Sequence, residues 1–312
     1  MRRDLPKSII LSEVSPRDGL QMETKILSTE EKLSLISALA ASGIQRIEVT
    51  GFVHPRAVPQ MADARQVAAL LPRDTGVRFG AFVPNAKGAE IAIEAGIDDI
   101  KCGIAASDSF NEINVRMDRD TATRTLHAMG ALDRPAGCEL VGTIGTAFGC
   151  PYEGEVPVER LRECLDVLGT IGCRIVHLAD TTGMANPDAI WKTLDYLGRY
   201  AGDVAIGLHL HNTRGAGIAN ALAGLMTGVT HFESSAGGLG GCPFAPRAVG
   251  NICSEDFVHM VEGMGIDSGI DLDRLIDAAL LAEQLVERPL PGMVMKSGKA
   301  STRFSVETRQ PK

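Results

Sequence analysis

The feature that most constrains the fold is a regular alternation of short apolar runs with longer amphipathic stretches, repeated along nearly the whole chain. Eight of the short runs are rich in Ile, Leu, Val, Ala and Gly, as is typical of parallel strands that are buried on both faces. The strands are expected at Ser8–Val14, Arg46–Thr50, Val77–Val83, Asp99–Ile104, Cys138–Gly145, Arg174–Ala179, Val204–His211 and His231–Ser235. Eight strands alternating with helices predict an α/β fold of the (β/α)8 TIM-barrel type rather than an open doubly wound sheet.

The intervening stretches carry the spacing of amphipathic helices, and several are followed by a glycine where a helix commonly ends. Helices are expected at Thr29–Ser42, Val58–Leu71, Ala86–Ala95, Val158–Ile171 and Pro187–Tyr200. The terminating glycines are Gly43, Gly96, Gly172 and Gly228.

A single catalytic domain over residues 1–312 is expected, because a barrel needs about 250 residues and no linker interrupts the pattern. The barrel is expected at about 8–250. Additional C-terminal helices are expected at Ser254–Met264 and Asp271–Val286, within about 254–288. A polar tail is expected at 289–312.

Composition excludes several classes of protein. The formal charge of -8, with no long basic run, argues against a nucleic-acid partner. No run approaches the ~18 apolar residues of a membrane span, so a protein without a membrane partner is expected. The seven cysteines are scattered, with no CxxC pair, which favours the reducing cytoplasm.

Polar residues, most of them ionisable, gather where the predicted strands end. In TIM barrels the catalytic groups come from the C-terminal strand ends and the loops that follow them, so these residues are expected at one mouth. They are Arg17 and Asp18 after the first strand, Glu48 in the second, Asp180 at the sixth, His209 and His211 at the seventh, and Cys242 and Asn251 after the eighth.

His209 and His211 give the sharpest local signal. Residues i and i+2 of a strand share a face, so both imidazoles are expected to point into the mouth. The alternative interpretation is a pair of hydrogen-bonded core histidines. A nearby carboxylate, Asp18, favours a metal site, to which Asn251 adds a neutral oxygen. Mixed nitrogen and oxygen ligands without a thiolate favour Mg²⁺ or Mn²⁺ over structural zinc.

The other mouth residues allow two interpretations each. Arg17 is either a surface partner of Asp18 or a contact for substrate negative charge. Cys242 stands in a glycine-rich loop, where a cysteine is more often inert than reactive. Glu48 and Asp180 either orient the metal ligands or transfer protons directly. The loop is not a phosphate-binding P-loop, because no Lys-Ser/Thr pair follows it.

At these residues the sequence resembles the 3-hydroxy-3-methylglutaryl-CoA lyases, within a barrel metallolyase family that also includes isopropylmalate synthases. The resemblance runs from about Ser8 to Val286. The matching segments are EVSPRDGLQ at Glu13–Gln21, GCPYEG at Gly149–Gly154, DTTG at Asp180–Gly183, HLHNT at His209–Thr213 and SSAGGLGGCPFA at Ser234–Ala245.

The resemblance implies cleavage of 3-hydroxy-3-methylglutaryl-CoA, or a close 3-hydroxyacyl-CoA, to a ketone such as acetoacetate and acetyl-CoA. It implies a divalent cation on Asp18, His209, His211 and Asn251. It also implies a homodimer that acts in leucine catabolism and ketone-body formation.

The resemblance further implies individual catalytic roles. Arg17 would stabilise the enolate oxygen with support from Glu48, and Asp180 or a ligand histidine such as His209 would be the base. Cys242 would deliver the proton. The expected substrate contacts are Arg17, Asn114, Thr182 and Arg214.

Several positions depart from the pattern of these lyases. Asn212 and Arg214 replace an Asp and a Tyr, Ser15 replaces a Gly, and Thr24 replaces a Lys. His177 and Ala179 also differ. These changes bear on the choice of acyl-CoA more than on the reaction type.

Three alternative functions remain open at this point. A condensing synthase would run the same chemistry forward, and an aldolase would act on a free hydroxy-oxoacid. A metal-binding barrel without activity is the third.

Overall fold

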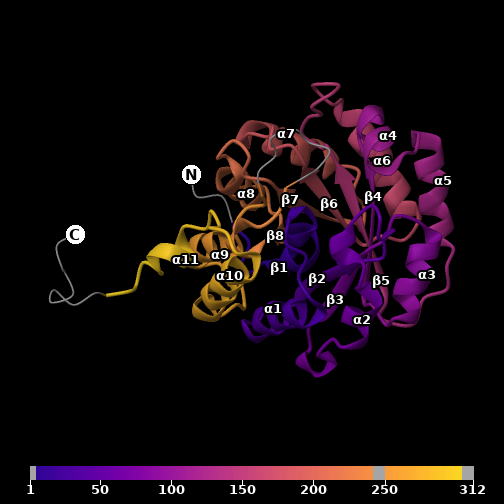
Figure 1. Ribbon diagram of the computed structural model, residues 1–312. Helices are drawn as coiled ribbons and strands as arrows, with labels where there is room; N and C mark the ends of the chain where they lie inside the picture. The colour runs from indigo at the N-terminus through magenta and orange to yellow at the C-terminus, as the bar shows by residue number, and fades with distance from the viewer. Residues whose placement is uncertain (1–4, 242–249, 304–312) are drawn as a thin grey trace.

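The computed structural model describes residues 5–241 and 250–303. Within them, eight parallel strands close into a barrel in the order β1 to β8, and helices surround it, so the fold is the predicted TIM barrel (Figure 1). The strands are β1 (Ile10–Glu13), β2 (Arg46–Gly51), β3 (Arg78–Phe82), β4 (Asp99–Ala105), β5 (Glu139–Gly145), β6 (Ile175–Asp180), β7 (Ala205–Leu210) and β8 (His231–Ser234). Each lies inside or within one residue of its predicted range.

The helices that follow the strands cover the outside of the barrel (Figure 1). They are α1 (Thr29–Ala41), α2 (Ala64–Ala69), α3 (Ala86–Glu94), α4 (Asp108–Val115), α5 (Arg119–Gly130), α6 (Val158–Thr170), α7 (Pro187–Leu197), α8 (Gly217–Met226), α9 (Ser254–Gly263), α10 (Leu272–Val286) and α11 (Val294–Ser297). Their inward faces are apolar and join the strands in one large core, except that Phe110 of α4 packs with Ala105 and Cys150 in a separate small cluster.

The prediction of a single helix at Val58–Leu71 is wrong. The segment forms a short 3₁₀ turn at Pro59–Met61 and then the brief helix α2. Between them Asp63 leaves helical geometry, with φ −96° and ψ 17°. Its carboxylate accepts hydrogen bonds from Thr29 and Lys32, at 2.8 and 2.5 Å, so contacts with α1 override the local helical pattern.

Two helices between β4 and β5 were not among the predicted segments. Helix α4 is short and polar, and it ends where Arg116 adopts a left-handed backbone with φ 55°. Helix α5 begins at an N-cap, where the Asp118 carboxylate accepts a hydrogen bond from the amide of Thr121 at 2.7 Å.

The C-terminal helices α9 and α10 lie where they were predicted, and α10 packs beside α1 (Figure 1). The chain after Pro289, which was expected to be a polar tail, is at first packed rather than solvated. Leu290, Val294 and Met295 are buried, and α11 lies against α9 and α10. The added helices therefore extend a few residues further than expected.

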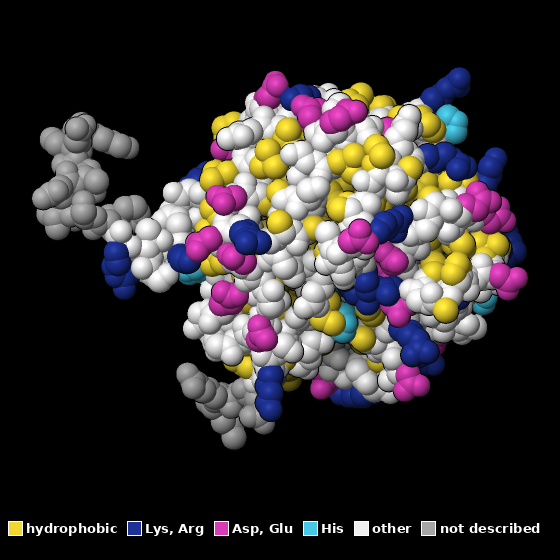
Figure 2. Space-filling model, turned by 90° about the horizontal axis from the view of Figure 1, so that it is seen from below, with side chains coloured by type: hydrophobic (Ala, Val, Ile, Leu, Met, Phe, Trp, Pro, Cys, Tyr) yellow, Lys and Arg dark blue, Asp and Glu magenta, His cyan; other side chains and the backbone are white. Residues whose placement is uncertain are grey.

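Charges of both signs are mixed over the face shown in Figure 2, with apolar side chains between them and no large single-sign field. No helix in the described part of the chain is both long enough and apolar enough to cross a membrane.

Candidate active site

The first polar element of the barrel mouth is the turn that follows β1. Ser15–Gly19 forms one π-helical turn, in which the amides of Arg17 and Gly19 both donate to the carbonyl of Val14, at 3.2 and 3.1 Å. Wide turns of this kind are frequent at functional sites. Here the turn brings Asp18, a buried carboxylate, to the mouth.

Asp18, His209 and His211 meet at this mouth. One ligand atom from each lies within 4.8 Å of the others, and all three residues are buried. The two histidine Nε2 atoms are 3.1 Å apart, so the two imidazoles at the end of β7 point to the same side. The three groups, which the sequence placed at the ends of the first and seventh strands, thus share one space.

Glu233, on β8, determines which ring nitrogen of His209 carries the proton. Its Oε2 lies 2.8 Å from His209 Nδ1. An ionised carboxylate is only an acceptor, so the proton of a neutral His209 lies on Nδ1 and the Nε2 lone pair points into the mouth. This is the usual carboxylate support of a metal-binding histidine.

Asn251 lies beside Asp18 and is the fourth candidate metal ligand. Its Nδ2 donates to Asp18 Oδ2 at 2.8 Å and to the Leu239 carbonyl at 3.1 Å, while its Oδ1 is buried without a hydrogen-bond partner. Rotating the amide by 180° exchanges the two atoms and turns the oxygen toward Asp18. Gly240, with φ 118°, leaves no room for a side chain, because a Cβ there would lie 2.6 Å from Asn251 Nδ2.

This donor set fits a divalent cation. Burial raises the pKa of Asp18, but attraction to a protonated His209, to Arg17 and to a protonated His211 outweighs it, so the pKa lies below its usual value. An ionised carboxylate, two imidazole nitrogens and an unpaired amide oxygen are suitable ligands for such an ion. These four are the residues predicted as metal ligands.

Arg17 lies beside this group and has three contacts. Its Nη1 donates to Asp18 Oδ1 at 3.0 Å, its Nε lies 3.3 Å from Glu48 Oε1, and its guanidinium stacks 4.2 Å from the centre of the Phe82 ring. Glu48 is buried on β2. A carboxylate on one side and a ring on the other hold the guanidinium at the mouth.

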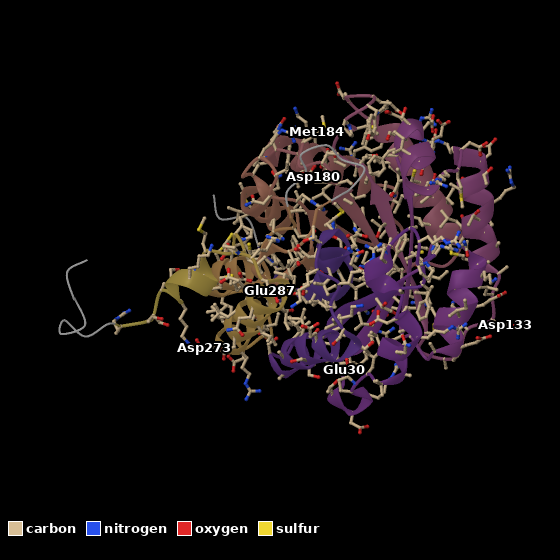
Figure 3. The ribbon with its side chains drawn as sticks, viewed as in Figure 1. Glu30, Asp133, Asp180, Met184, Asp273 and Glu287 are labelled. Atoms are coloured by element: carbon tan, nitrogen blue, oxygen red, sulfur yellow. The ribbon has the colours of Figure 1, made fainter. Side chains whose placement is uncertain are left out.

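Asp180 ends β6 at the same mouth (Figure 3). Its Oδ1 accepts hydrogen bonds from the amides of Met184 and Ala185, at 2.8 and 3.1 Å, while its buried Oδ2 has no hydrogen-bond partner. Burial raises the pKa of Asp180 to about 6, although the two amides and Arg214 oppose the shift. A carboxyl that titrates near neutrality can accept a proton during turnover.

The remaining predicted residues lie at the rim or beyond. Arg214 donates from Nη1 to the carbonyls of Thr182 and Gly183, at 2.8 and 2.9 Å, and so ties the loop after β7 to the loop after β6. Thr182 is buried, whereas Asn114 is exposed on α4. Cys242 lies outside the described residues.

Three residues beneath the mouth were not predicted as part of the site: Glu233, Lys101 and His177. All three are buried. A signal was present, since an ionisable residue inside an apolar strand is rarely buried without a partner. The partners come from different strands, however, so they were not apparent from local spacing.

Comparison with known proteins agrees with this geometry. The HMGL-like family model matches residues 8–281. The (R)-citramalyl-CoA lyase of Chloroflexus aurantiacus is 43% identical over 304 residues, covering 94% of this chain and 95% of that protein. The hydroxymethylglutaryl-CoA lyase of Bacillus subtilis is 38% identical, covering 95% of this chain and 99% of that protein.

Solved structures give the same result. An HMG-CoA lyase of Acinetobacter baumannii, determined in complex with coenzyme A and 3-methylmalate, superposes with a TM-score of 0.90 at 35% identity, covering 96% of this chain and 98% of that one. The B. subtilis HMG-CoA lyase also gives a TM-score of 0.90, covering 94% of this chain and 98% of that one. With a closed barrel, this mouth and near-complete coverage by named lyases, the chain belongs to the HMGL-like family and is an enzyme of the oxo-acid-lyase type.

Proposed function

We propose that the protein is a divalent-metal-dependent lyase that cleaves a 3-hydroxy-3-methylacyl-CoA thioester between C2 and C3. The products are a ketone and acetyl-CoA. The observation that carries the proposal is the convergence of Asp18, His209 and His211 beside Arg17 and the raised-pKa carboxyl of Asp180. Lyases that act on such thioesters are among the relatives, which favours cleavage over condensation.

Asp18, His209, His211 and Asn251 are the residues that would hold the cation, with Mg²⁺ or Mn²⁺ as the ion that best suits their oxygens and nitrogens. When bound, the cation supplies Lewis-acid polarisation of substrate oxygens. The chain provides the rest of the chemistry.

Asp180 would take the proton of the 3-hydroxyl through its unpaired Oδ2. As the C2–C3 bond breaks, C3 becomes the ketone carbon, and the bonding electron pair forms the enolate of acetyl-CoA. Arg17, fixed by Glu48, would stabilise the negative charge on the thioester oxygen. Cys242 would then donate a proton to C2.

Two acyl groups are candidates. A glutaryl substrate, 3-hydroxy-3-methylglutaryl-CoA, would give acetoacetate. The shorter citramalyl-CoA, which is 3-hydroxy-3-methylsuccinyl-CoA, would give pyruvate. The 43% identity to the Chloroflexus lyase is the reason for including it as a candidate. Arg214 and Thr182 at the rim, together with Asn114, are proposed substrate contacts. A role in leucine catabolism or ketone-body formation applies only to the glutaryl substrate.

An assay of purified protein with both thioesters tests the proposal. Acetyl-CoA and the ketone are measured with added Mg²⁺ or Mn²⁺ and after chelation. Metal-dependent release of both products in equal amounts is expected, together with its loss in His211→Ala. Cleavage that persists in the chelated protein would contradict the metal requirement, and turnover of neither thioester would contradict the substrate class.

Cys242→Ala tests the acid assignment separately. If Cys242 is the proton donor, turnover falls while metal binding is retained. Unchanged turnover would remove Cys242 from the mechanism and leave the metal proposal intact.

The assembly and compartment are also proposals. The described cysteines are all free thiols, which supports a reducing compartment such as the cytoplasm. A homodimer is proposed from the family likeness, and sedimentation would test it.

A further inference from the structure

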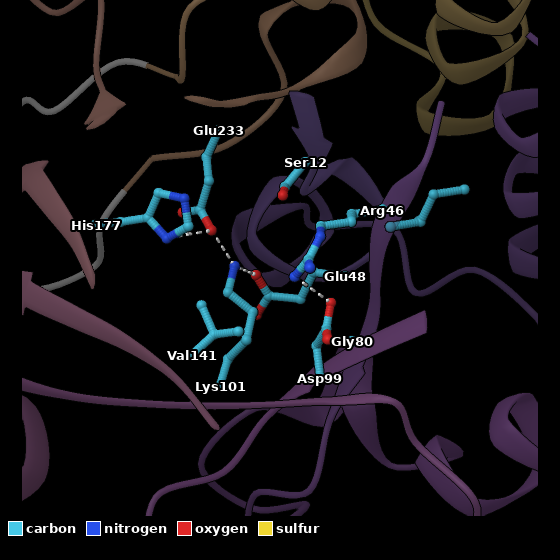
Figure 4. A pocket seen from close by; sticks show the side chains of 10 residues that line it. Ser12, Arg46, Glu48, Gly80, Asp99, Lys101, Val141, His177 and Glu233 are labelled. Carbon is cyan, nitrogen blue, oxygen red and sulfur yellow. Dashed lines mark hydrogen bonds and ion pairs between the residues drawn. The ribbon is translucent and has the colours of Figure 1, made fainter. Parts of the chain in front are cut away.

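A line of charged side chains runs through the barrel beneath the mouth (Figure 4). Lys101, on β4, lies between two carboxylates, with its Nζ 2.5 Å from Glu48 Oε2 and also paired with Glu233 Oε1. The other oxygen of each carboxylate faces the mouth. Glu48 Oε1 lies 3.3 Å from Arg17 Nε, and Glu233 Oε2 lies 2.8 Å from His209 Nδ1.

Lys101 therefore occupies the centre of a continuous chain of contacts that joins Arg17 to His209. Each carboxylate uses one oxygen for Lys101 and one for a mouth residue, so the position of Lys101 affects both ends. The mouth residues belong to the two halves of the proposed chemistry, the enolate contact and the metal site.

The interior of the barrel is built to hold this lysine. Lys101, Glu48 and Glu233 have exposed fractions of 7%, 4% and 2%, and charges this deeply buried are stable only when paired. Burial lowers the pKa of Lys101, but attraction by Glu233 and Glu48 outweighs it, so the pKa lies above its usual value. The cavity around these groups has a volume of only about 10 Å³.

His177, which lines the same cavity, does not supply the charge. Its Nδ1 lies 3.4 Å from Glu233 Oε1, but neither ring nitrogen has a hydrogen-bond partner. Burial lowers the pKa of His177 to about 3, so the ring is neutral at physiological pH. Its space depends on Gly207, where a Cβ would lie 2.5 Å from the ring. Lys101 is therefore the cation shared by the two carboxylates.

We propose that Lys101 is a positioning residue, which sets the location of Arg17 through Glu48 and the orientation of the His209 ring through Glu233. The inference rests on the proposed function, because it assigns these two ends to one reaction. It adds a requirement: the two halves of the site are coupled through a side chain that contacts neither substrate nor metal.

The competing explanation is charge balance alone. In that case Lys101 only keeps two buried carboxylates from destabilising the fold. Any second substitution that balances the buried charge would then restore both stability and activity. The two explanations differ in what happens when stability is recovered without the lysine.

Lys101→Met tests the proposal, because methionine retains most of the apolar stem and removes the charge. Co²⁺ is used as a spectroscopic probe of His209, and kcat and KM are measured with the thioester that the wild type cleaves. The expected results are a changed Co²⁺ absorption spectrum and a kcat lower by roughly 10–100-fold. KM is expected to change less than about threefold, because Lys101 does not contact substrate.

Two further variants separate positioning from stability. Val141→Ala enlarges the same cavity without touching a charge, and it should leave the spectrum and kcat unchanged while lowering the melting temperature. The double variant Glu48→Gln, Lys101→Met removes one charge of each sign. It should recover stability relative to Lys101→Met. Its kcat should be lower than that of Glu48→Gln alone and its Co²⁺ spectrum different, because the His209 end also depends on Lys101.

A Lys101→Met protein with the wild-type spectrum and kcat would overturn the proposal, as would a double variant that matches Glu48→Gln in both readouts. If Lys101→Met does not fold, the comparison of the double variant with Glu48→Gln alone decides by the same two readouts. The Co²⁺ spectrum also separates this inference from the proposed function: a wild type that binds Co²⁺ but cleaves neither thioester contradicts the lyase proposal, while the spectral comparison still decides the role of Lys101.

Discussion

The two ends of the barrel both carry dense charge, but they differ in how that charge is satisfied. At the N-terminal end, the first residues of β2 to β5 are Arg46, Arg78, Asp99 and Glu139. Asp99 accepts from Arg46 at 3.0 Å and from Arg78 at 2.6 Å, and Glu139 lies 3.5 Å from Arg46. Among the buried side-chain atoms described, none of those without a partner belongs to this cluster.

The C-terminal end leaves polar atoms unsatisfied. Asp180 Oδ2 and Asn251 Oδ1 are buried without hydrogen-bond partners, and two imidazole nitrogens face one carboxylate across a few ångströms. Burying an unpaired polar atom costs free energy, and a bound ligand would recover that cost at the mouth. We infer that the charged residues at the N-terminal (lower) end stabilise the fold. Those at the C-terminal (upper) end bind ligands and take part in catalysis.

The largest expected effect is at Asp18. Asp18→Asn keeps the shape of the side chain but removes the charge that faces two imidazoles. We expect kcat to fall by more than the roughly 10–100-fold typical of losing an outer partner of a metal ligand. Steady-state kinetics and Mn²⁺ titration calorimetry would measure it. Full activity in Asp18→Asn would break the assignment of the upper end to chemistry.

The pH dependence of Asp180 should give the next largest effect. If Asp180 is the base, it must be ionised, so kcat/KM should fall about tenfold per pH unit below pH 6 and level off above it. Asp180→Asn should remove this acidic limb of the pH profile, the decrease in kcat/KM below pH 6, along with most of the activity. An acidic limb that persists unchanged in the variant would assign the titration to another group.

The same carboxyl has the opposite effect on stability. Because the folded-state pKa of Asp180, about 6, lies above the usual value of 3.8, its contribution to stability is full below pH 3.8 and is lost as pH rises through 6. At pH 7.5, Asp180→Asn should therefore be as stable as the wild type or more so, by at most about 3 kcal/mol. Urea unfolding at pH 7.5 would measure this difference, and a marked loss of stability would contradict it.

The smallest effect on activity is expected at the lower end. Asp99→Asn leaves two arginines without their buried carboxylate, and we expect the free energy of unfolding to fall by about 3 kcal/mol. The kcat of the folded protein should stay unchanged. Asp195→Asn, which breaks an exposed pair with Arg199, is the matched control and should cost less than about 1 kcal/mol. A large loss of kcat in Asp99→Asn would contradict the inference that charges at the N-terminal end affect stability but not catalysis.

Much of the barrel could be predicted from sequence because its signals are local. Alternation gave each strand to within a few residues, and the i and i+2 rule placed His209 and His211 on one face. The rule that active groups lie at C-terminal strand ends then grouped Asp18 with them, and the structure brings the three together.

What local patterns could not provide was pairing across the barrel. Lys101, Glu48 and Glu233 stand on β4, β2 and β8, and their contact depends on the register of a closed sheet. Helix α2 was mispredicted for a similar reason, because Asp63 is held by α1 rather than by its own segment. Tertiary contacts decided both cases.

A crystal structure of the protein with Mn²⁺, using the anomalous signal of the metal, would test the proposed metal site most directly. One strong peak is expected at the mouth, within coordination distance of Asp18, His209 and His211, with the Asn251 oxygen turned toward it. A peak elsewhere, or the two imidazoles pointing away from Asp18 around an empty space, would contradict it.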